Sequence, residues 1–371
     1  MQYRRFGKTE EKVSVLGFGC MRFPKTNNED DASIDEARSI AMLRNAIDNG
    51  VNYVDTAYFY HKMKSEELVG KALLDGYRDK VFVATKLPLG HVENEDSFDE
   101  LLNTQLNRLQ TDHIDFYLLH AVSRNSWENK VLPFGILDKL RQAKADGRIR
   151  HIGFSFHDDL DAFKMIVDGF DAWEFCQIQF NYIDTDYQAG LEGLQYAAER
   201  DLGVVIMEPL QGGSLARPEK EMLAMMDGRN PVQFALDYIW SFPAVSLLLS
   251  GMSDEQQVQD NLQYADESKE NKLTQAEIQL LSEIKNVHDK LNLIPCRDCK
   301  YCMPCPHGVE IPDAFKAFNE GITQGNRRII EQIFPTIEAN CRQCAECGEC
   351  ETKCPQQIEI IKKLKVVRNN V

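Results

Sequence analysis

Cysteine is concentrated toward one end of this sequence. The chain of 371 residues contains 11 cysteines, and all but Cys20 and Cys176 follow residue 290. They form two runs, CRDCKYCMPCP at 296–306 and CRQCAECGECETKCP at 341–355. Three thiolates separated by two residues each can wrap around one face of an iron–sulfur cubane, and a fourth cysteine followed by proline typically reaches the other cluster. The spacing therefore predicts two 4Fe-4S clusters.

Each predicted cluster takes three cysteines from one run and its fourth from the other run. The first set is Cys296, Cys299, Cys302 and Cys354. The second set is Cys344, Cys347, Cys350 and Cys305. Structural zinc is the alternative, because CxxC pairs also build four-thiolate zinc sites, although these normally separate two pairs by a longer loop. Cys341 has no place in either set and is expected to be a spare thiol, with substitution for one of the ligands as the alternative. Cys20 and Cys176 have the character of small buried hydrophobes.

A second group of reactive side chains lies in the first third of the chain. Asp55, Lys86 and His120 stand at the ends of short apolar runs typical of β-strands, and Tyr60 follows Asp55 by five residues. An adjacent ammonium lowers the pKa of a tyrosine, which is otherwise near 10, so Lys86 would help Tyr60 to donate a proton. Asp55 would hold Lys86, and His120 would hydrogen-bond a carbonyl oxygen. Such a set suits protonation of a carbonyl oxygen while hydride reaches its carbon.

The elements that must position these residues are repeated βα units. Strand candidates recur at roughly 30-residue spacing between residues 14 and 262, and they are 15–19, 51–56, 80–86, 113–120, 149–155, 177–181, 203–209 and 245–251. An open doubly wound sheet usually has fewer strands and a G-x-G-x-x-G turn, which is absent here, so the pattern favours a (β/α)8 TIM barrel. Neighbouring strands lie about 4.8 Å apart, so the strand-end side chains can converge in one pocket. Ser33 with Glu36 has the pattern of a capping box before one of the helices.

The domain organisation follows from the same pattern. We expect an α/β barrel over residues 1–273, an amphipathic connecting helix over 274–290, and a small, mainly helical iron–sulfur domain over 291–371. Helical patterns without good strands occupy 312–338. A tail with few large apolar side chains would fold poorly alone, so metal clusters would also stabilise it.

Several segments resemble the aldo-keto reductase family, from residue 1 to about 265. They are VSVLGFGCMRFP, VNYVDTAYFY, ATKLP, DFYLLH and IGFSFH. The resemblance implies a catalytic tetrad of Asp55, Tyr60, Lys86 and His120, with Tyr60 as general acid. It also implies that a nicotinamide dinucleotide binds in extended form at the barrel mouth, without a Gly-rich Rossmann turn. The tail resembles helical dicluster ferredoxin domains.

The same resemblance implies a set of cofactor contacts. Ser155 and Gln179 match residues that bind the nicotinamide carboxamide, and Met207 stands where many members stack an aromatic ring. Gly212 and Gly213 would let backbone amides approach the pyrophosphate. The remaining expected contacts are Gly19, Met21, Asp55, Ser250, Gly251, Gln257 and Asn261.

One departure concerns the choice of dinucleotide. Members that prefer NADPH commonly carry a Lys and an Arg where this chain has Gly251 and Gln257, and those charges clamp the 2′-phosphate. The cofactor is therefore expected to be NADP or NAD, and a flavin stays open as a different redox cofactor. Nicotinamide moves two electrons and each cubane normally moves one, so the clusters are either structural or exchange electrons with a redox partner protein.

Composition limits the other partners. Forty-two basic and 58 acidic residues give a formal charge of -16, which disfavours nucleic acid and anionic membranes. No apolar run approaches the roughly 20 residues that span a bilayer. The opening residues lack a secretory apolar stretch, so we expect a reducing cytoplasm and no disulfides.

The sequence thus predicts an oxidoreductase that reduces a small aldehyde or ketone, or oxidises the alcohol, with NAD(P)H. Two alternatives stay open. In one, the protein is an electron-transfer iron–sulfur subunit whose barrel is a docking scaffold. In the other, the barrel senses a nicotinamide and signals through the state of the clusters. The substrate itself would be set by long loops such as 121–133 and by the tail.

Overall fold

The computed structural model describes residues 1–27, 30–324, 336–337 and 339–369. Its contacts divide the chain into two compact units. The first comprises Met1–Pro209 and Leu236–Leu273, and the second comprises Leu210–Ala235 and Thr274–Val371. The loop and helices of 210–235, which sequence order places within the barrel region, therefore group with the cysteine-rich tail. The division into 1–273, 274–290 and 291–371 stays a prediction about the folding units.

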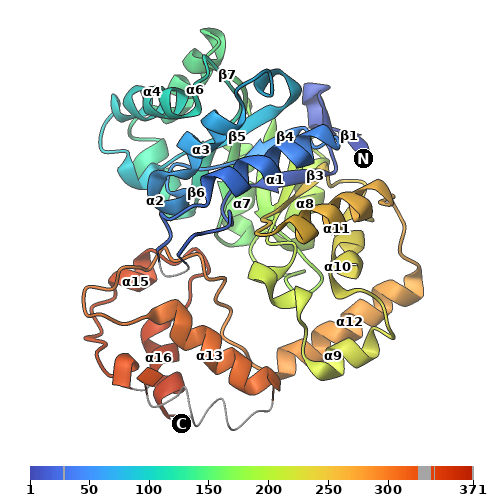
Figure 1. Ribbon diagram of the computed structural model, residues 1–371. Coiled ribbons are helices and arrows are strands. Elements are labelled where there is room, and N and C mark those ends of the chain that lie inside the picture. The colour runs from blue at the N-terminus through green and yellow to red at the C-terminus, as the bar shows by residue number, and fades with distance from the viewer. Residues whose placement is uncertain (28–29, 325–335, 338, 370–371) are drawn as a thin grey trace. The chain divides into compact units, whose positions relative to one another are not determined.

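A closed parallel barrel is the centre of the first unit (Figure 1). Within the described residues its eight strands are β3 (Leu16–Gly19), β4 (Tyr53–Asp55), β5 (Phe82–Leu87), β6 (Ile114–Val122), β7 (Ile149–Phe156), β8 (Phe175–Gln179), β9 (Gly203–Met207) and β10 (Leu247–Ser250). Each strand pairs with the next in chain order, and β10 pairs with β3 to close the barrel. The predicted (β/α)8 barrel is confirmed.

Helices surround the strands, as Figure 1 shows for α1, α3, α4 and α8. The helices of this unit are α1 (Glu36–Asp48), α2 (Tyr60–Met63), α3 (Ser65–Ala72), α4 (Ser97–Leu109), α5 (Arg124–Ser126), α6 (Ile136–Ala145), α7 (Leu160–Asp168), α8 (Gly190–Ala198) and α11 (Glu255–Asp266). The shorter turns are η1 (Gly7–Thr9), η2 (Arg78–Lys80), η3 (Leu89–His91) and η4 (Trp127–Val131). Helix α10 (Pro231–Trp240) begins in the second unit and ends in the first.

The predicted cap of α1 is wrong. The side chain of Asp35, not Ser33, accepts a hydrogen bond from the backbone N–H of Arg38 at 3.2 Å. The Ser33 hydroxyl instead donates to the carbonyls of Asn27 and Asp30, both at 2.7 Å. Serine and aspartate are both favoured as N-caps of helices. Here the serine hydroxyl is bonded within the preceding turn, so the aspartate caps the helix.

An antiparallel hairpin that the strand pattern did not reveal precedes the barrel. It is formed by β1 (Tyr3–Arg5) and β2 (Lys12–Ser14). Phe6 follows β1 and is fully buried, with ring-centroid distances of 6.0 Å to Tyr53, 4.6 Å to Phe116 and 5.4 Å to Phe175. These rings lie near the amino ends of three barrel strands. The hairpin therefore closes the end of the barrel opposite the carboxyl ends of the strands.

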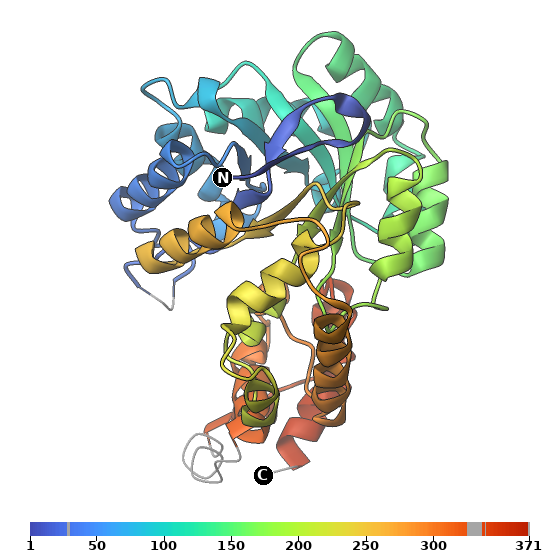
Figure 2. The ribbon, with the colours of Figure 1, turned by 90° about the vertical axis from the view of Figure 1, so that its right-hand side faces the viewer.

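The second unit is largely helical. Its elements are η5 (Gln211–Ala216), α9 (Lys220–Met225), α12 (Gln275–Lys290), α13 (Ile311–Gln324), α15 (Glu349–Thr352) and α16 (Ile360–Asn369). Helix α12 confirms the amphipathic helix expected over 274–290, and Thr274 with Glu277 forms its capping box. Helix α9 lies beside α12, and α13 lies beside α16 (Figure 2). Of the helical pattern expected at 312–338, α13 is present, while 325–335 and 338 lie outside the described residues.

The small core of this unit joins segments far apart in sequence. It includes Ile294, Val309, Phe315, Ile360 and Val367, which are all buried. Cysteines from both runs pack against this core. Among the helices of the described residues, none is long and apolar enough to cross a bilayer.

Phe6→Ala should lower the free energy of unfolding of the barrel by about 3–5 kcal/mol, because it removes a ring from a close-packed interior and leaves a cavity. The measurement is chemical denaturation of the full chain. Leu74→Ala is the control, since Leu74 is 48% exposed and its loss should cost little. Equal, small losses for both variants would contradict the proposed packing of the hairpin.

Candidate active site

A buried ion pair stands at the mouth of the barrel. Lys86 Nζ lies 2.7 Å from both carboxylate oxygens of Asp55, and the two side chains are almost inaccessible to solvent. The ammonium also donates to the Thr56 carbonyl at 2.8 Å. Burial raises the pKa of the Asp55 carboxyl, and the nearby Lys86 opposes that shift. The sequence prediction that Asp55 holds Lys86 agrees with this geometry.

Strand periodicity explains why Lys86 points inward. Side chains alternate between the two faces of a strand, so the residue before it, Thr85, faces the surrounding helices. Thr85 donates to the buried carboxylate of Glu66 at 2.7 Å, and Gln105 donates to the same oxygen at 2.7 Å. Gln105 also donates to the Lys86 carbonyl at 3.0 Å. Hydrogen bonds from the helix side of the strand therefore fix the backbone that carries the Lys86 ammonium.

Tyr60 and His120 lie beside this ion pair. Lys86 Nζ lies 5.2 Å from the centroid of the Tyr60 ring, and the Tyr60 and His120 ring centroids are 6.3 Å apart in an edge arrangement. Tyr60 is half-buried at the start of α2, on the loop that follows β4. The fold thus brings all four residues of the predicted tetrad to one end of the barrel.

The environment of His120 favours its neutral form. Burial, then the positive charge of Lys86 and the neighbouring His157, hold the pKa of His120 well below the usual 6.5. Strand β6 is irregular between Leu119 and Val122, and Ala121 has φ 53°. This irregularity turns the strand at His120, where bulges often re-aim a functional side chain.

The predicted nicotinamide contacts occupy the ends of β7, β8 and β9. The Ser155 hydroxyl accepts the backbone N–H of Ala121 at 2.8 Å. Gln179 is fully buried and its amide donates to Asp184 at 2.8 Å. Met207 is half-buried, and the Gln177 amide lies 3.5 Å from its sulfur. These polar groups are ordered by the barrel itself, as a preformed site requires.

The predicted adenosine loop lies after β10. Ser250 accepts a hydrogen bond from Asn261 at 2.9 Å, and both residues are buried. Gln257 is bonded within the loop, since it accepts from Ser253 N at 2.9 Å and donates to Asp254 at 2.7 Å. A side chain at Gly251 would clash, because its Cβ would lie 2.7 Å from Cγ of Arg22.

Strand β3 brings the other expected contacts next to this loop. Gly19 pairs with Asp55 on β4, and a Cβ at Gly19 would lie 3.3 Å from the Ser250 carbonyl oxygen. Met21 is half-buried just beyond. Cys20 is buried between them, and burial first, then Asp55, raise the pKa of its thiol. A low-reactivity thiol of this kind agrees with the small hydrophobe expected there.

The predicted pyrophosphate loop belongs to the second unit. Gly212 and Gly213 have φ of 68° and 100°, which favour glycine. A Cβ at Gly212 would lie 3.0 Å from the carbonyl oxygen of Arg297, in the first cysteine run. Apart from its two chain neighbours, no described residue has an atom within 4 Å of where a Cβ of Gly213 would lie, so the backbone there is open to close approach. The phosphate role of both glycines stays a prediction.

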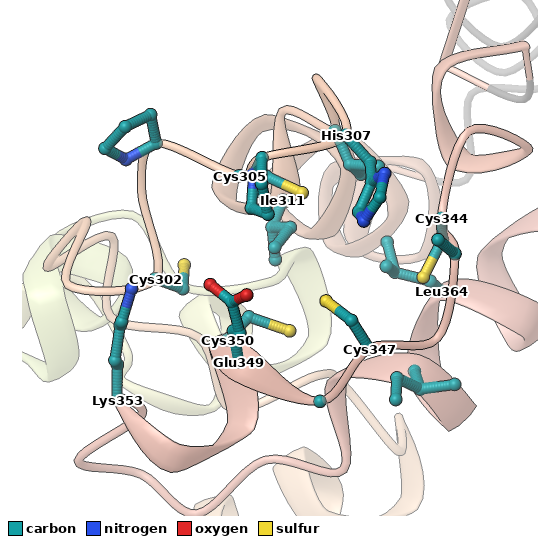
Figure 3. A pocket seen from close by; sticks show the side chains of 16 residues that line it. Cys302, Cys305, His307, Ile311, Cys344, Cys347, Glu349, Cys350, Lys353 and Leu364 are labelled. Carbon is teal, nitrogen blue, oxygen red and sulfur yellow. The ribbon is translucent and has the colours of Figure 1, made fainter.

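Cysteines from both runs line one pocket in the second unit. Its lining includes Cys305 from the first run and Cys344, Cys347 and Cys350 from the second, and Figure 3 shows their sulfur atoms around one opening. These four are the second predicted ligand set. Cys302 also reaches this lining.

The first predicted set also gathers in space. Burial raises the pKa of the Cys302 thiol to about 12, and the neighbouring thiols that raise it further are Cys299, Cys296 and Cys354. Among the described residues, no three His, Cys, Asp or Glu side chains come close enough to hold a single metal ion. The two ligand sets stay predictions.

Cys341 belongs to neither set. It is 3% exposed and packs in the core of the second unit. Burial raises the pKa of its thiol to about 11. Its role as a spare thiol stays a prediction.

Sequence reasoning missed the bonds that hold the Tyr60 loop. Ser65 Oγ donates to the Cys20 carbonyl at 3.0 Å, and it lies 2.9 Å from Oγ1 of Thr56. The backbone N–H of Phe23 donates to Nε2 of His61 at 3.2 Å. The only sequence signal was a histidine directly after the tyrosine, which by itself indicates nothing.

Comparison with known proteins agrees with this architecture. The model of the Aldo/keto reductase family matches residues 15–286, and that of the 4Fe-4S dicluster domain matches residues 295–359. The uncharacterized oxidoreductase YqkF of Bacillus subtilis (strain 168) is 25% identical over 317 residues, which cover 76% of this chain and 95% of that protein.

Solved structures show the same barrel. The holo form of the aldo-keto reductase AKR11C1 from Bacillus halodurans is 25% identical with a TM-score of 0.64, covering 76% of this chain and 96% of that one. An aldo-keto reductase from Klebsiella pneumoniae in complex with NADPH is 23% identical with a TM-score of 0.62, covering 76% and 95%, and this likeness concerns the fold. The chain belongs to the aldo/keto reductase family and carries a 4Fe-4S dicluster domain after its barrel.

Proposed function

We propose that this protein reduces the carbonyl group of a small aldehyde or ketone, or oxidises the corresponding alcohol, with a nicotinamide dinucleotide. The observation that carries the proposal is the buried Lys86–Asp55 pair with the Tyr60 and His120 rings beside it. Four side chains of complementary chemistry at one barrel mouth are hard to explain as structural residues alone.

Each residue has a distinct part in the proposed step. NAD(P)H, when bound, would supply the hydride that reaches the carbonyl carbon. Tyr60 Oη would give its proton to the carbonyl oxygen, which leaves an alcohol and a phenolate. Lys86 would stabilise that phenolate, and Asp55 would keep the ammonium in place. His120, neutral because of its buried position, would donate a hydrogen bond to the same oxygen.

The dinucleotide would lie across the strand ends, where uncharged polar residues would bind its carboxamide and its adenosine part. Ser155 and Gln179 are placed at the ends of β7 and β8, where a carboxamide would need polar partners. Ser250, Asn261 and the β10 loop would receive the adenosine part. NADP and NAD both remain compatible, because Gly251 brings no charge and Gln257 is bonded within its own loop.

We also propose two 4Fe-4S clusters, held by the two interleaved cysteine sets. The gathering of Cys296, Cys299 and Cys354 near Cys302, and of Cys305 with the second run around one cavity, supports this assignment. The clusters would stabilise the second unit and would pass electrons to a redox partner only if some carrier splits the hydride pair. Cluster thiolates must stay reduced, so a reducing compartment such as the cytoplasm is the expected location.

Tyr60→Phe should lower kcat for carbonyl reduction by about 10²–10⁴-fold, since it removes the general acid without changing the shape of the ring. The assay is consumption of NAD(P)H with a panel of aldehydes and ketones. Tyr58→Phe is the matched control on the same loop and should retain activity. If Tyr60→Phe stays fully active, the barrel mouth is not a reductase site. That result would favour the alternative in which the protein is an electron-transfer subunit and the barrel is a docking scaffold.

Gln257→Arg should lower KM for NADPH by about tenfold and leave KM for NADH nearly unchanged, because a charge-assisted hydrogen bond to the 2′-phosphate contributes about 1.5–3 kcal/mol. Gln257→Leu is the control for loss of the loop bonds alone. An equal change in KM for both dinucleotides would place the 2′-phosphate elsewhere.

Anaerobically purified protein should contain about eight iron and eight sulfide per chain, as two cubanes require. Cys354→Ser and Cys350→Ser should each lose about half of both, since each removes a ligand from a different set. Cys341→Ser should keep the full content. One zinc per chain, or iron loss in Cys341→Ser equal to that of the other variants, would show that the ligand assignment is wrong.

A further inference from the structure

We propose that His61 is a positioning residue for Tyr60: its imidazole clamps the Tyr60 loop to the segment after β3 and so fixes where the phenol meets the carbonyl oxygen. The inference rests on the proposed function, because it gives His61 a part in that reaction. His61 directly follows Tyr60 in the sequence, and none of the roles assigned above belongs to it.

The backbone after Tyr60 is strained. His61, Lys62 and Met63 have φ of 51°, 50° and 71°, so three successive residues other than glycine adopt the left-handed conformation. For a residue with a Cβ this conformation is less favourable than the right-handed form. Strain of this kind persists only where the surroundings hold it, and it is concentrated at functional sites. A specific anchor is therefore needed next to Tyr60.

The His61 ring supplies that anchor. Its side chain is 2% exposed. Nε2 accepts the backbone N–H of Phe23 at 3.2 Å, and Nδ1 lies 2.9 Å from the carbonyl oxygen of Asp31. A carbonyl oxygen can only accept, so Nδ1 carries the proton and Nε2 is the acceptor. The two bonds fix both the tautomer and the orientation of the ring.

The segment after β3 is well placed to act as the fixed side of this clamp. Cys20 N donates to the Asp55 carbonyl at 2.8 Å, and the Cys20 carbonyl accepts from Ser65 Oγ at 3.0 Å. One bond precedes Tyr60 in sequence and the other follows it. His61 adds a third attachment directly beside the tyrosine, on the same short segment. The loop that carries the phenol is thus tied at three points to a strand end of the barrel.

The clamp requires an uncharged ring. A protonated His61 would direct an N–H at the N–H of Phe23, and the bond would be lost. Burial is the largest cause that lowers the pKa of His61 below 6.5, while Asp31 raises it and Lys25 and Arg22 lower it. The Asp31 carboxylate lies 3.8 Å from Nδ1. Because the folded-state pKa is depressed, the clamp is intact at neutral pH and weakens as pH falls through that value.

The test compares His61→Ala, His61→Gln and Lys62→Gly in the full cluster-loaded chain. His61→Ala should lower kcat by about 10–100-fold with KM for the dinucleotide little changed, as expected for a misplaced acid. A glutamine amide can accept from Phe23 and donate to Asp31, so His61→Gln should restore kcat to within a few-fold and lose the acid-side decline with pH. Lys62 is exposed, and its ion pair with Asp30 at 2.8 Å lies at the surface, where such pairs contribute little. Lys62→Gly should therefore resemble the wild type and show that relief of strain does not matter.

The outcomes separate the two proposals. If Tyr60→Phe is inactive and His61→Ala keeps the wild-type kcat, the positioning role is wrong while the reductase assignment stands. If His61→Ala and His61→Gln lose only thermal stability, with unchanged kcat in the folded fraction, His61 is merely structural. If Tyr60→Phe is as active as the wild type, both proposals fail together.

Discussion

The barrel mouth depends on one constraint: the charge of Lys86 is buried and therefore needs Asp55. An unpaired buried ammonium would lose its proton or destabilise the fold, so the carboxylate, the Thr56 carbonyl and the ordered backbone of β5 must all be present. The parallel pairing of β4 with β5 brings the carboxyl ends of these two strands together, and helices cover the outer face of the barrel (Figure 1). In the proposed reaction, the same Lys86 charge that Asp55 neutralises would stabilise the Tyr60 phenolate.

The second unit meets a comparable constraint with different chemistry. Its core joins Ile294 to residues as distant as Val367, and cysteines of both runs pack against that core. A small apolar cluster of this kind stabilises a domain weakly, and cross-links between distant segments compensate. Interleaved cluster ligands would supply such cross-links, since each proposed set joins the segment near residue 300 to the segment near residue 350. Cluster loading and folding of this unit would then be one equilibrium.

The sequence allowed the barrel to be predicted, because the barrel depends on spacing; the tetrad and the cysteine sets that the spacing indicates stay predictions. Strand periodicity places Asp55, Lys86 and His120 at neighbouring strand ends, and a CxxC repeat is legible without coordinates. Properties that depend on long-range contacts were missed. The Phe6 hairpin has only three-residue strands, and Asp35 rather than Ser33 caps α1. The proposed role of His61 depends on a bond to Phe23, 38 residues earlier. Grouping of 210–235 with the tail likewise follows from contacts and not from sequence order.

The chemistry proposed for the barrel moves hydride and protons, whereas 4Fe-4S clusters would move single electrons, and this difference limits how the two units could cooperate. The four residues at the barrel mouth are acid–base groups: a carboxylate, an ammonium, a phenol and a neutral imidazole. In the proposed reaction they move a proton and stabilise charge, and none of them carries a single electron. A cubane carries one electron and no hydride. Exchange between the two chemistries requires a carrier that accepts a pair and releases single electrons, as a flavin does. Without such a carrier, the barrel would catalyse hydride transfer alone. The clusters would then have no part in electron transfer and would serve to stabilise the fold of the second unit.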